Sequence, residues 1–294
     1  MINPVFALEH RRRARRGRLA ALVTGELVVL AAVLALTYQA QTAGAGLTTS
    51  PATTDAAALG RSLFQWLVFA LTLLLLFVVP AATAGAVAGE REQRTLVPLL
   101  LTRLAPRSIL AGKLGTAAAT IGVLLAAALP LLAVPTVVGG VSLARVTATT
   151  AVLAAVAVGL AGLTLACSGL ARRAQTAAML AYGAIAVLTF GTLFLAGAAA
   201  VLDRSAGEDP ADPPGALLAP NPLVVVADVA ADRSGGVSAD TPLDGLRTLA
   251  HRSDRPGGRV VPLWLLGPAV IVTSAAIGLV VAGDRMRIPA IHPP

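Results

Sequence analysis

Long apolar runs separated by short charged segments are the dominant pattern along this chain. The runs are continuous in Leu, Val and Ala and do not alternate apolar with polar residues, which is evidence against the strands of a membrane β-barrel. A helix needs roughly 20 apolar residues to cross about 30 Å of hydrocarbon. Stretches of this length occur at residues 19–39, 62–88, 112–137, 146–170, 175–201 and 263–283. The pattern therefore predicts an all-α, polytopic transmembrane helix bundle with six spans, forming a single domain over residues 1–294.

Composition agrees with a membrane location and limits the classes of partner that we expect. Apolar residues make up 56% of the chain and charged residues 13%, and the mean hydropathy is +0.79, far from the mix of soluble domains. The net charge of +8 comes from basic residues that cluster beside the apolar runs, with no basic groove carrying interleaved aromatic residues. We therefore expect contact with membrane lipid and no nucleic-acid partner. The single cysteine, Cys167, excludes an intramolecular disulfide and a cysteine-based metal site.

The positions of Arg and Lys predict which ends of the spans face the cytoplasm. The basic segments on one side are HRRRARRGR at 10–18, residues 89–114, Arg172–Arg173, and Arg285 with Arg287. The other side receives residues 40–61, a turn at Gly139–Gly140 and residues 202–262, where nine acids outnumber six arginines. The charges therefore predict cytoplasmic N- and C-termini and an extracytoplasmic loop at about 202–262.

The first apolar run has a second interpretation, because a basic stretch, an apolar run and the small residues AQTAGAG also fit a cleaved secretory signal. The run is longer than the 7–15 residues usual for the apolar part of a signal peptide. Its removal would also disturb the pattern in which the basic segments of all the spans lie on one side, so we favour a span. It also contains Glu26. An acid inside a span is a functional candidate, here for proton relay, and snorkelling or a local pair with Arg18 explains it equally well.

The segment GEREQRTLVPLLLTRLAPRSILAGKL, residues 89–114, separates the second and third predicted spans. Burying its seven charged residues in hydrocarbon would cost about 17–25 kcal/mol, at roughly 2.5–3.5 kcal/mol each, so it lies at or beyond the cytoplasmic surface. Leucines recur at helical spacing at Leu96, Leu99, Leu100 and Leu104. We predict a short cytoplasmic helix that begins near Pro98. Its residues fit both a connector resting on anionic headgroups and a docking element for a soluble partner.

This segment resembles the one between the second and third spans of type-2 ATP-binding-cassette (ABC) transporter permeases. The shared features are a Glu-rich start, a Thr-Leu pair, a leucine run, a Pro and a terminal Gly-Lys. The opening NPVFALEHRRRARRGR resembles the amphipathic N-terminal helix of such permeases, and the six spans, the long outer segment before the last span and its Asn221–Pro222 pair also fit. Two positions depart from the family pattern, because Arg94 stands where Gly commonly precedes the Thr-Leu pair and Pro98 interrupts the helix.

The resemblance implies two groups of functional residues. The first is a coupling helix that docks on the ATPase, with contacts from Glu90, Arg91, Glu92, Arg94, Thr95, Leu96, Leu99, Leu100, Arg103 and Leu104. The second is the N-terminal interfacial helix, with Asn3, Pro4, Glu9, Arg11 and Arg13. The charged residues of the coupling helix would form salt-screened contacts, and its leucines would fill an apolar cleft of the partner.

Sequence motifs give no sign of catalysis by this chain. The phosphate-binding loop GxxxxGK[ST] is absent, since Gly112–Lys113 has Arg107 in place of the first glycine and Leu114 in place of the hydroxyl. Histidines fall outside the spans and far apart, and no nucleophile with a base or cluster of metal ligands is visible. We therefore expect no catalytic residue, bound cofactor or metal here, and ATP with Mg on a separate ABC ATPase subunit.

These observations predict the membrane-spanning permease of an ABC exporter in a bacterial cytoplasmic membrane. It would pair with a second permease chain, as a homodimer or heterodimer, and would move an unidentified substrate outward. The alternative is an ATPase-independent secondary transporter or an accessory membrane scaffold; a proton-coupled transporter would normally carry more ionisable groups in its spans. Two packing features remain open: Gly85 with Gly89 and Gly159 with Gly162 permit close helix approach, and residues 217–230 fit either half-helices or an ordinary loop.

Overall fold

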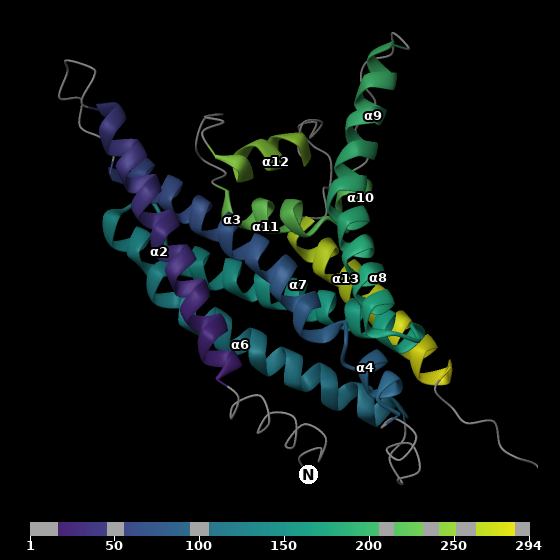
Figure 1. Ribbon diagram of the computed structural model, residues 1–294. Helices are drawn as coiled ribbons and strands as arrows, with labels where there is room; N and C mark the ends of the chain where they lie inside the picture. The colour runs from purple at the N-terminus through teal and green to yellow at the C-terminus, as the bar shows by residue number, and fades with distance from the viewer. Residues whose placement is uncertain are drawn as a thin grey trace, which may run out of the picture.

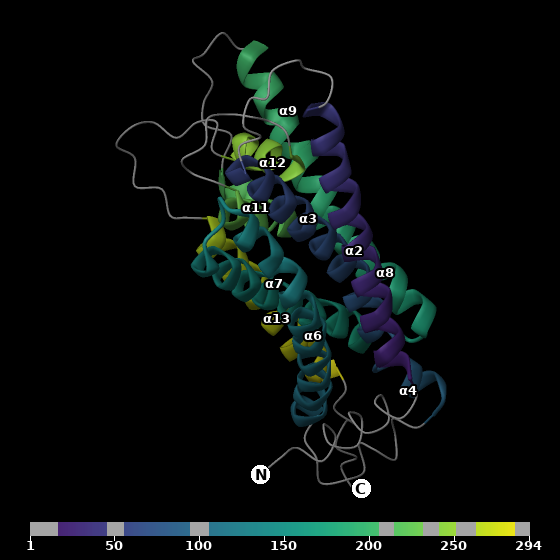
Figure 2. The same cartoon turned by 90° about the vertical axis from the view of Figure 1, so that its left-hand side faces the viewer.

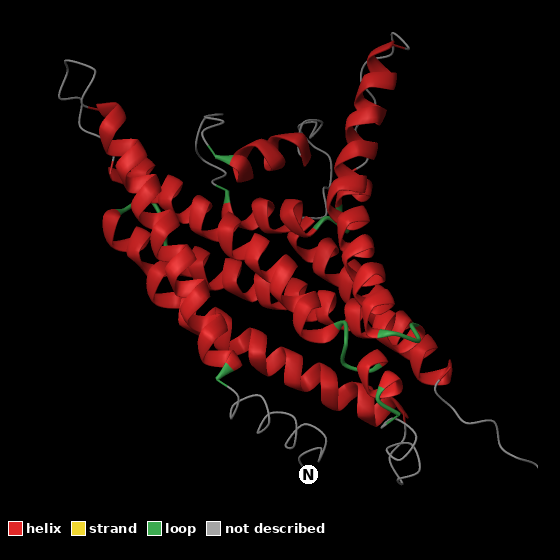
Figure 3. Cartoon of the chain, in the orientation of Figure 1, coloured by secondary structure: helices red, strands yellow, loops and turns green. Residues whose placement is uncertain are grey.

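The computed structural model describes residues 17–45, 56–94, 106–205, 215–231, 241–250 and 263–285. Within these ranges every regular element is a helix (Figure 3). Six helical segments are long and apolar enough to cross a membrane, so the prediction of a multi-pass helical membrane protein is confirmed. The segments are α2 (Arg18–Ala45), α3 (Ala56–Thr83), α6 (Pro106–Val138), α7 (Leu143–Leu170), the unbroken run of α8 (Ala174–Ala186), η1 (Val187–Gly191) and α9 (Thr192–Ser205), and α13 (Leu263–Arg285).

The long helices run back and forth between two ends of the bundle (Figures 1 and 2). At one end, which we call the island end, Val87, Leu110, Leu165 and Ala282 from four separate segments pack together. At the opposite end, which we call the loop end, Gln41 of α2 donates a hydrogen bond to Ser62 of α3 (3.1 Å). By the helix ends to which they belong, the described basic residues of the island end are Arg18, Arg91, Arg94, Arg107, Lys113, Arg172, Arg173 and Arg285, and those of the loop end are Arg61, Arg145, Arg204 and Arg247. The basic charge is therefore concentrated at one end of the bundle.

Helix α7 lies at the centre of the bundle, in contact with α3, α6, α8 and α13. Its closest neighbour is α13, and glycines permit this approach: a Cβ on Gly159 would lie 2.7 Å from Cγ2 of Ile271, and one on Gly162 would lie 2.9 Å from Cβ of Ala275. Close packing at Gly159 and Gly162 is thus confirmed. Around Gly85 and Gly89, in contrast, an added Cβ would have no other atom within 4 Å.

Three short helices lie at the loop end: α10 (Gly215–Leu218), α11 (Pro222–Ala230) and α12 (Pro242–Ala250). The open question about residues 217–230 is therefore decided in favour of short helices. Helix α11 is buried against α3, α7 and α13, and the amphipathic α12 covers it (Figure 1). Asn221 caps α11, since its Oδ1 accepts hydrogen bonds from the amides of Leu223 (2.9 Å) and Val224 (3.3 Å), and Pro222 occupies the first turn.

The same Asn221 also joins α11 to the fifth span. Its Nδ2 donates hydrogen bonds to the Thr189 carbonyl oxygen and to Oγ1 of Thr192, both at 2.8 Å. Thr189 lies in η1, a single π-helical turn, and such turns shift the backbone hydrogen bonding of a helix. The buried side chain of Asn221 therefore forms hydrogen bonds both with the amides at the start of α11 and with the π-helical turn of the fifth span.

Candidate functional site

The described part of the charged segment after the second span is α4 (Ala88–Glu92) with Gln93 and Arg94. The predicted span 62–88 extends beyond the helix, because α3 ends at Thr83 and a turn precedes α4. The Oγ of Ser168, at the end of α7, accepts hydrogen bonds from the amides of Val87 and Ala88, both at 3.0 Å. A buried hydroxyl thus satisfies two orphan amides at the start of α4 and stabilises a new helix inside the apolar run.

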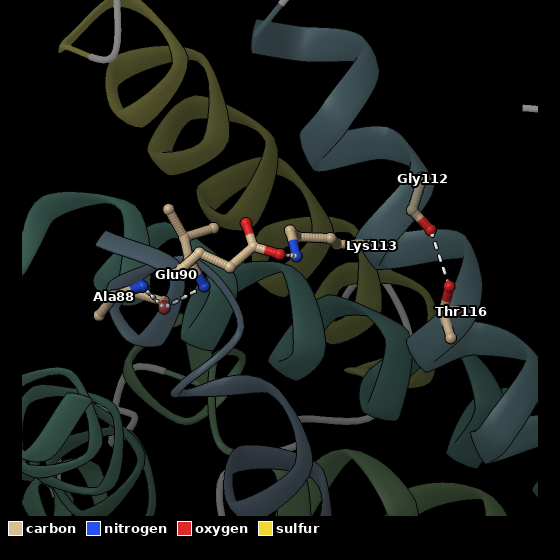
Figure 4. Close-up of polar contacts among 7 residues, drawn as sticks. Ala88, Glu90, Gly112, Lys113 and Thr116 are labelled. Atoms are coloured by element: carbon tan, nitrogen blue, oxygen red, sulfur yellow. Dashed lines mark hydrogen bonds and ion pairs between the residues drawn. The ribbon is translucent and has the colours of Figure 1, made fainter. Parts of the chain in front are cut away.

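Glu90 forms an ion pair with Lys113 of α6, with 2.8 Å between Oε1 and Nζ (Figure 4). The side chain of Lys113 is only 2% exposed and that of Glu90 is 31% exposed. A lysine so deeply buried needs an anionic partner, and removing one member of a buried pair typically costs about 3–5 kcal/mol. This contact fixes α4 against the first turns of the third span.

Arg91 and Glu92 hold the connection between α7 and α8. The guanidinium of Arg91 donates hydrogen bonds to the carbonyl oxygens of Ala171 (2.6 Å) and Gly169 (3.1 Å), at the C-terminus of α7. Oε2 of Glu92 accepts a hydrogen bond from the amide of Ala174 (3.2 Å), the first residue of α8. A cation at a helix C-terminus and an anion at a helix N-terminus both complement the helix dipole. Arg91 and Glu92 therefore stabilise the C-terminus of α7 and the N-terminus of α8, on either side of the connection.

We call residues Ala88–Arg94, with their partners on α6, α7 and α8, the α4 junction. The resemblance implies that Glu90, Arg91 and Glu92 contact a soluble partner, and in the structure each of them contacts another part of the same chain. Arg94 differs, because its side chain is exposed and its φ is +58°. That left-handed conformation is the one glycine adopts most readily. Arg94 therefore has a backbone conformation that suits Gly.

Other predicted site residues lie outside the described residues and stay predictions. They are Thr95, Leu96, Leu99, Leu100, Arg103 and Leu104 of the coupling helix, and Asn3, Pro4, Glu9, Arg11 and Arg13 of the N-terminal helix.

Glu26 lies on the inner face of α2 and is only 5% exposed. Its Oε2 is buried and has no hydrogen-bond partner among the described residues. Neither snorkelling to water nor a pair with Arg18 therefore accounts for the placement of Oε2.

Two residues that hold the α4 junction were missed by sequence reasoning. Lys113 is the only lysine among 23 basic residues, and it stands just inside the third predicted span, so an intramembrane partner was a signal available in the sequence. Ser168 carries no such signal, since serine is ordinary near the end of an apolar helix.

In comparisons with known proteins, no protein-family model and no curated protein matched this chain. The assignment of function therefore depends on the sequence resemblance and on the α4 junction.

Proposed function

We propose that this chain is the membrane-spanning permease subunit of an ABC exporter, with the island end in the cytoplasm. A separate ABC ATPase docks on residues 95–104 and Arg94, and a second permease chain completes the transport path. ATP hydrolysis on that subunit moves the substrate outward, and this chain carries out no covalent chemistry.

The observation that supports this proposal best is the bracing of the α4 junction. A coupling element must transmit displacement instead of absorbing it, so it needs stiff attachment to several spans. The Glu90–Lys113 pair links the junction to α6, the Ser168 cap links it to α7, and Arg91 and Glu92 link it to the turn before α8. A push on the residues that follow Arg94 would therefore reach four spans, including α3, from which the junction continues directly.

A second candidate, an ATPase-independent transporter, is favoured by one observation: the buried Oε2 of Glu26, inside the first span, has no hydrogen-bond partner among the described residues. One buried acid supports it less than the junction supports coupling, because a proton-coupled transporter would normally carry more ionisable groups in its spans.

The proposal expects an ABC ATPase to be encoded beside this gene, and it is tested by co-expressing that ATPase with the tagged chain and measuring co-purification in mild detergent. We expect Arg94→Glu to weaken co-purification, increasingly so at low salt, and Leu99→Glu with Leu100→Glu to abolish it. Arg285→Glu is the matched control, an exposed arginine at the same end on α13, and should leave association unchanged. Unchanged association of the double leucine variant, with normal size-exclusion behaviour, would refute docking at this segment.

A further inference from the structure

A cavity of about 270 Å³ lies between α2, α3 and α6, and Glu26 is the one ionisable residue among its described lining residues. The remaining wall is apolar, with Leu22 and Val29 from α2, Leu75 and Val78 from α3, and Leu124 from α6. Leu22 and Val29 are 38% and 42% exposed, so the side of the cavity formed by α2 reaches the outer surface of the bundle. In a membrane that surface meets lipid, and the cavity is therefore accessible to a molecule dissolved in the bilayer.

A second, larger cavity of about 780 Å³ continues from the first toward the island end. The two share Ala21, Leu22 and Val78 as lining residues. Arg18 lies at its outer limit and is exposed. Eight residues of helix, about 12 Å, separate Arg18 from Glu26, so solvent at the membrane surface screens the guanidinium from the carboxyl group. The combined space therefore has Arg18 toward the island end and Glu26 among apolar residues farther along α2.

The Glu26 carboxyl group gives this space its chemical preference. Glu26 is only 5% exposed, and its Oε2 has no hydrogen-bond partner among the described residues. A buried acceptor without a donor is costly, and the cost is relieved by a ligand that brings both a donor and a positive charge. Apolar walls in turn favour an apolar body.

We propose that this cavity binds lipophilic organic cations, with the cationic nitrogen at Glu26 and the apolar body between α2, α3 and α6. Binding is a property of this chain alone and does not depend on an ATPase, so it stands apart from the function proposed above.

Glycines at two places provide matched variants. Gly25 lines the cavity, and a Cβ there would have no atom within 4 Å beyond its own helix backbone and chain neighbours, so Gly25→Leu fills the space and retains the Glu26 carboxyl group. Gly122 on α6 is exposed like Gly25 and has equally open surroundings, but it lines neither cavity, so Gly122→Leu adds the same side chain elsewhere. Glu26→Gln keeps the shape of the side chain and removes its charge.

The test measures fluorescence anisotropy of two probes with the purified full chain in phosphatidylcholine nanodiscs, relative to empty nanodiscs. The probes are rhodamine 6G, a lipophilic cation with N–H donors, and Nile red, a neutral lipophilic dye. We expect Glu26→Gln to weaken rhodamine 6G binding at least tenfold and to change Nile red binding less than twofold. Gly25→Leu should weaken binding of both probes, and Gly122→Leu should change neither.

Three results would overturn the proposal. The first is an unchanged rhodamine 6G affinity in Glu26→Gln, which would leave the carboxyl group without a role in recognition. The second is an equal loss of both probes in that variant, which would make Glu26 a structural residue. The third is no rhodamine 6G binding to the wild-type chain, which would leave the cavity to a lipid acyl chain or to a second copy of the protein.

Discussion

At the scale of single residues, Arg94 carries a conformational cost that substitution can reveal. Its φ of +58° disfavours residues with a Cβ. Because glycine has no such penalty, we expect Arg94→Gly to stabilise the protein by about 0.5–1 kcal/mol, after allowing for the greater freedom of glycine in the unfolded chain. A higher apparent melting temperature in detergent would show this gain. If Arg94→Gly raises the stability but weakens association with the ATPase, the effect of the backbone conformation at this position is separate from the effect of its charge.

The control for Arg94 is its neighbour Gln93, which has an ordinary φ of −78°. Gln93→Gly removes a side chain without relieving any strain, so we expect a loss of up to about 1 kcal/mol. Melting temperatures that move in the same direction for both glycine variants would contradict the conformational explanation.

Charge positions were predictable from sequence, but their partners were not. The cost of burying ions places Glu90, Arg91 and Glu92 outside the hydrocarbon, whatever they contact. Glu90 pairs with Lys113, 23 positions away, and Arg91 contacts Ala171, 80 positions away, and no local pattern encodes such pairings. Glu26 was identifiable as unusual because an acid interrupts an apolar run, whereas its orientation toward a cavity depends on how α2 packs against α3.

At the scale of elements, the contact between α7 and α13 depends on the absence of a side chain at Gly162. A Cβ there would lie 2.9 Å from Cβ of Ala275. We therefore expect Gly162→Ala to lower stability by about 1–3 kcal/mol, because α13 must move away from α7. A second change, Ala275→Gly, removes the opposing Cβ and should restore most of the loss. Thermal unfolding of both single variants and the double variant measures this coupling.

An outward-facing glycine distinguishes packing from a general effect of glycine replacement. Gly183 of α8 is exposed, and a Cβ there would have no other atom within 4 Å. Gly183→Ala should be neutral or slightly stabilising, since alanine favours helix more than glycine does. If Gly183→Ala and Gly162→Ala lower the melting temperature equally, close approach at Gly162 is not the cause.

Helices that cross the membrane were predictable because hydrocarbon leaves a chain few alternatives to a long apolar helix. The end of α3 at Thr83 was not, since the cap that stabilises α4 comes from Ser168 on a distant helix. Asn221–Pro222 is an intermediate case. Asn before Pro is a local signal for a helix start, yet the burial of α11 depends on α3, α7 and α13 around it, so sequence alone left a loop open as well.

At the scale of the whole molecule, the arrangement of helix ends and the distribution of charge independently distinguish the same two ends of the bundle. Six spans return the chain to the side from which α2 begins, and the described arginines and the lysine are concentrated at that same island end. Basic residues beside spans are retained in the cytoplasm during insertion. The proposed docking of an ATPase depends on this sidedness, because ATP and its hydrolysing subunit are cytoplasmic.

Sidedness can be measured with cysteines introduced into a Cys167→Ala background, which removes the single native thiol. Gln93 and Asp284 are exposed at the island end, and Thr248 is exposed on α12 at the loop end. We expect a membrane-impermeant maleimide to label Thr248→Cys in intact cells, and to label Gln93→Cys and Asp284→Cys only after permeabilisation, because the charge bias holds the island end inside. Labelling of positions 93 and 284 together, whichever side they occupy, tests that α4 and the end of α13 share a face. Labelling of positions 93 and 248 from the same side would contradict both the bundle topology and the proposed docking site, since a span would then have to be lost between them.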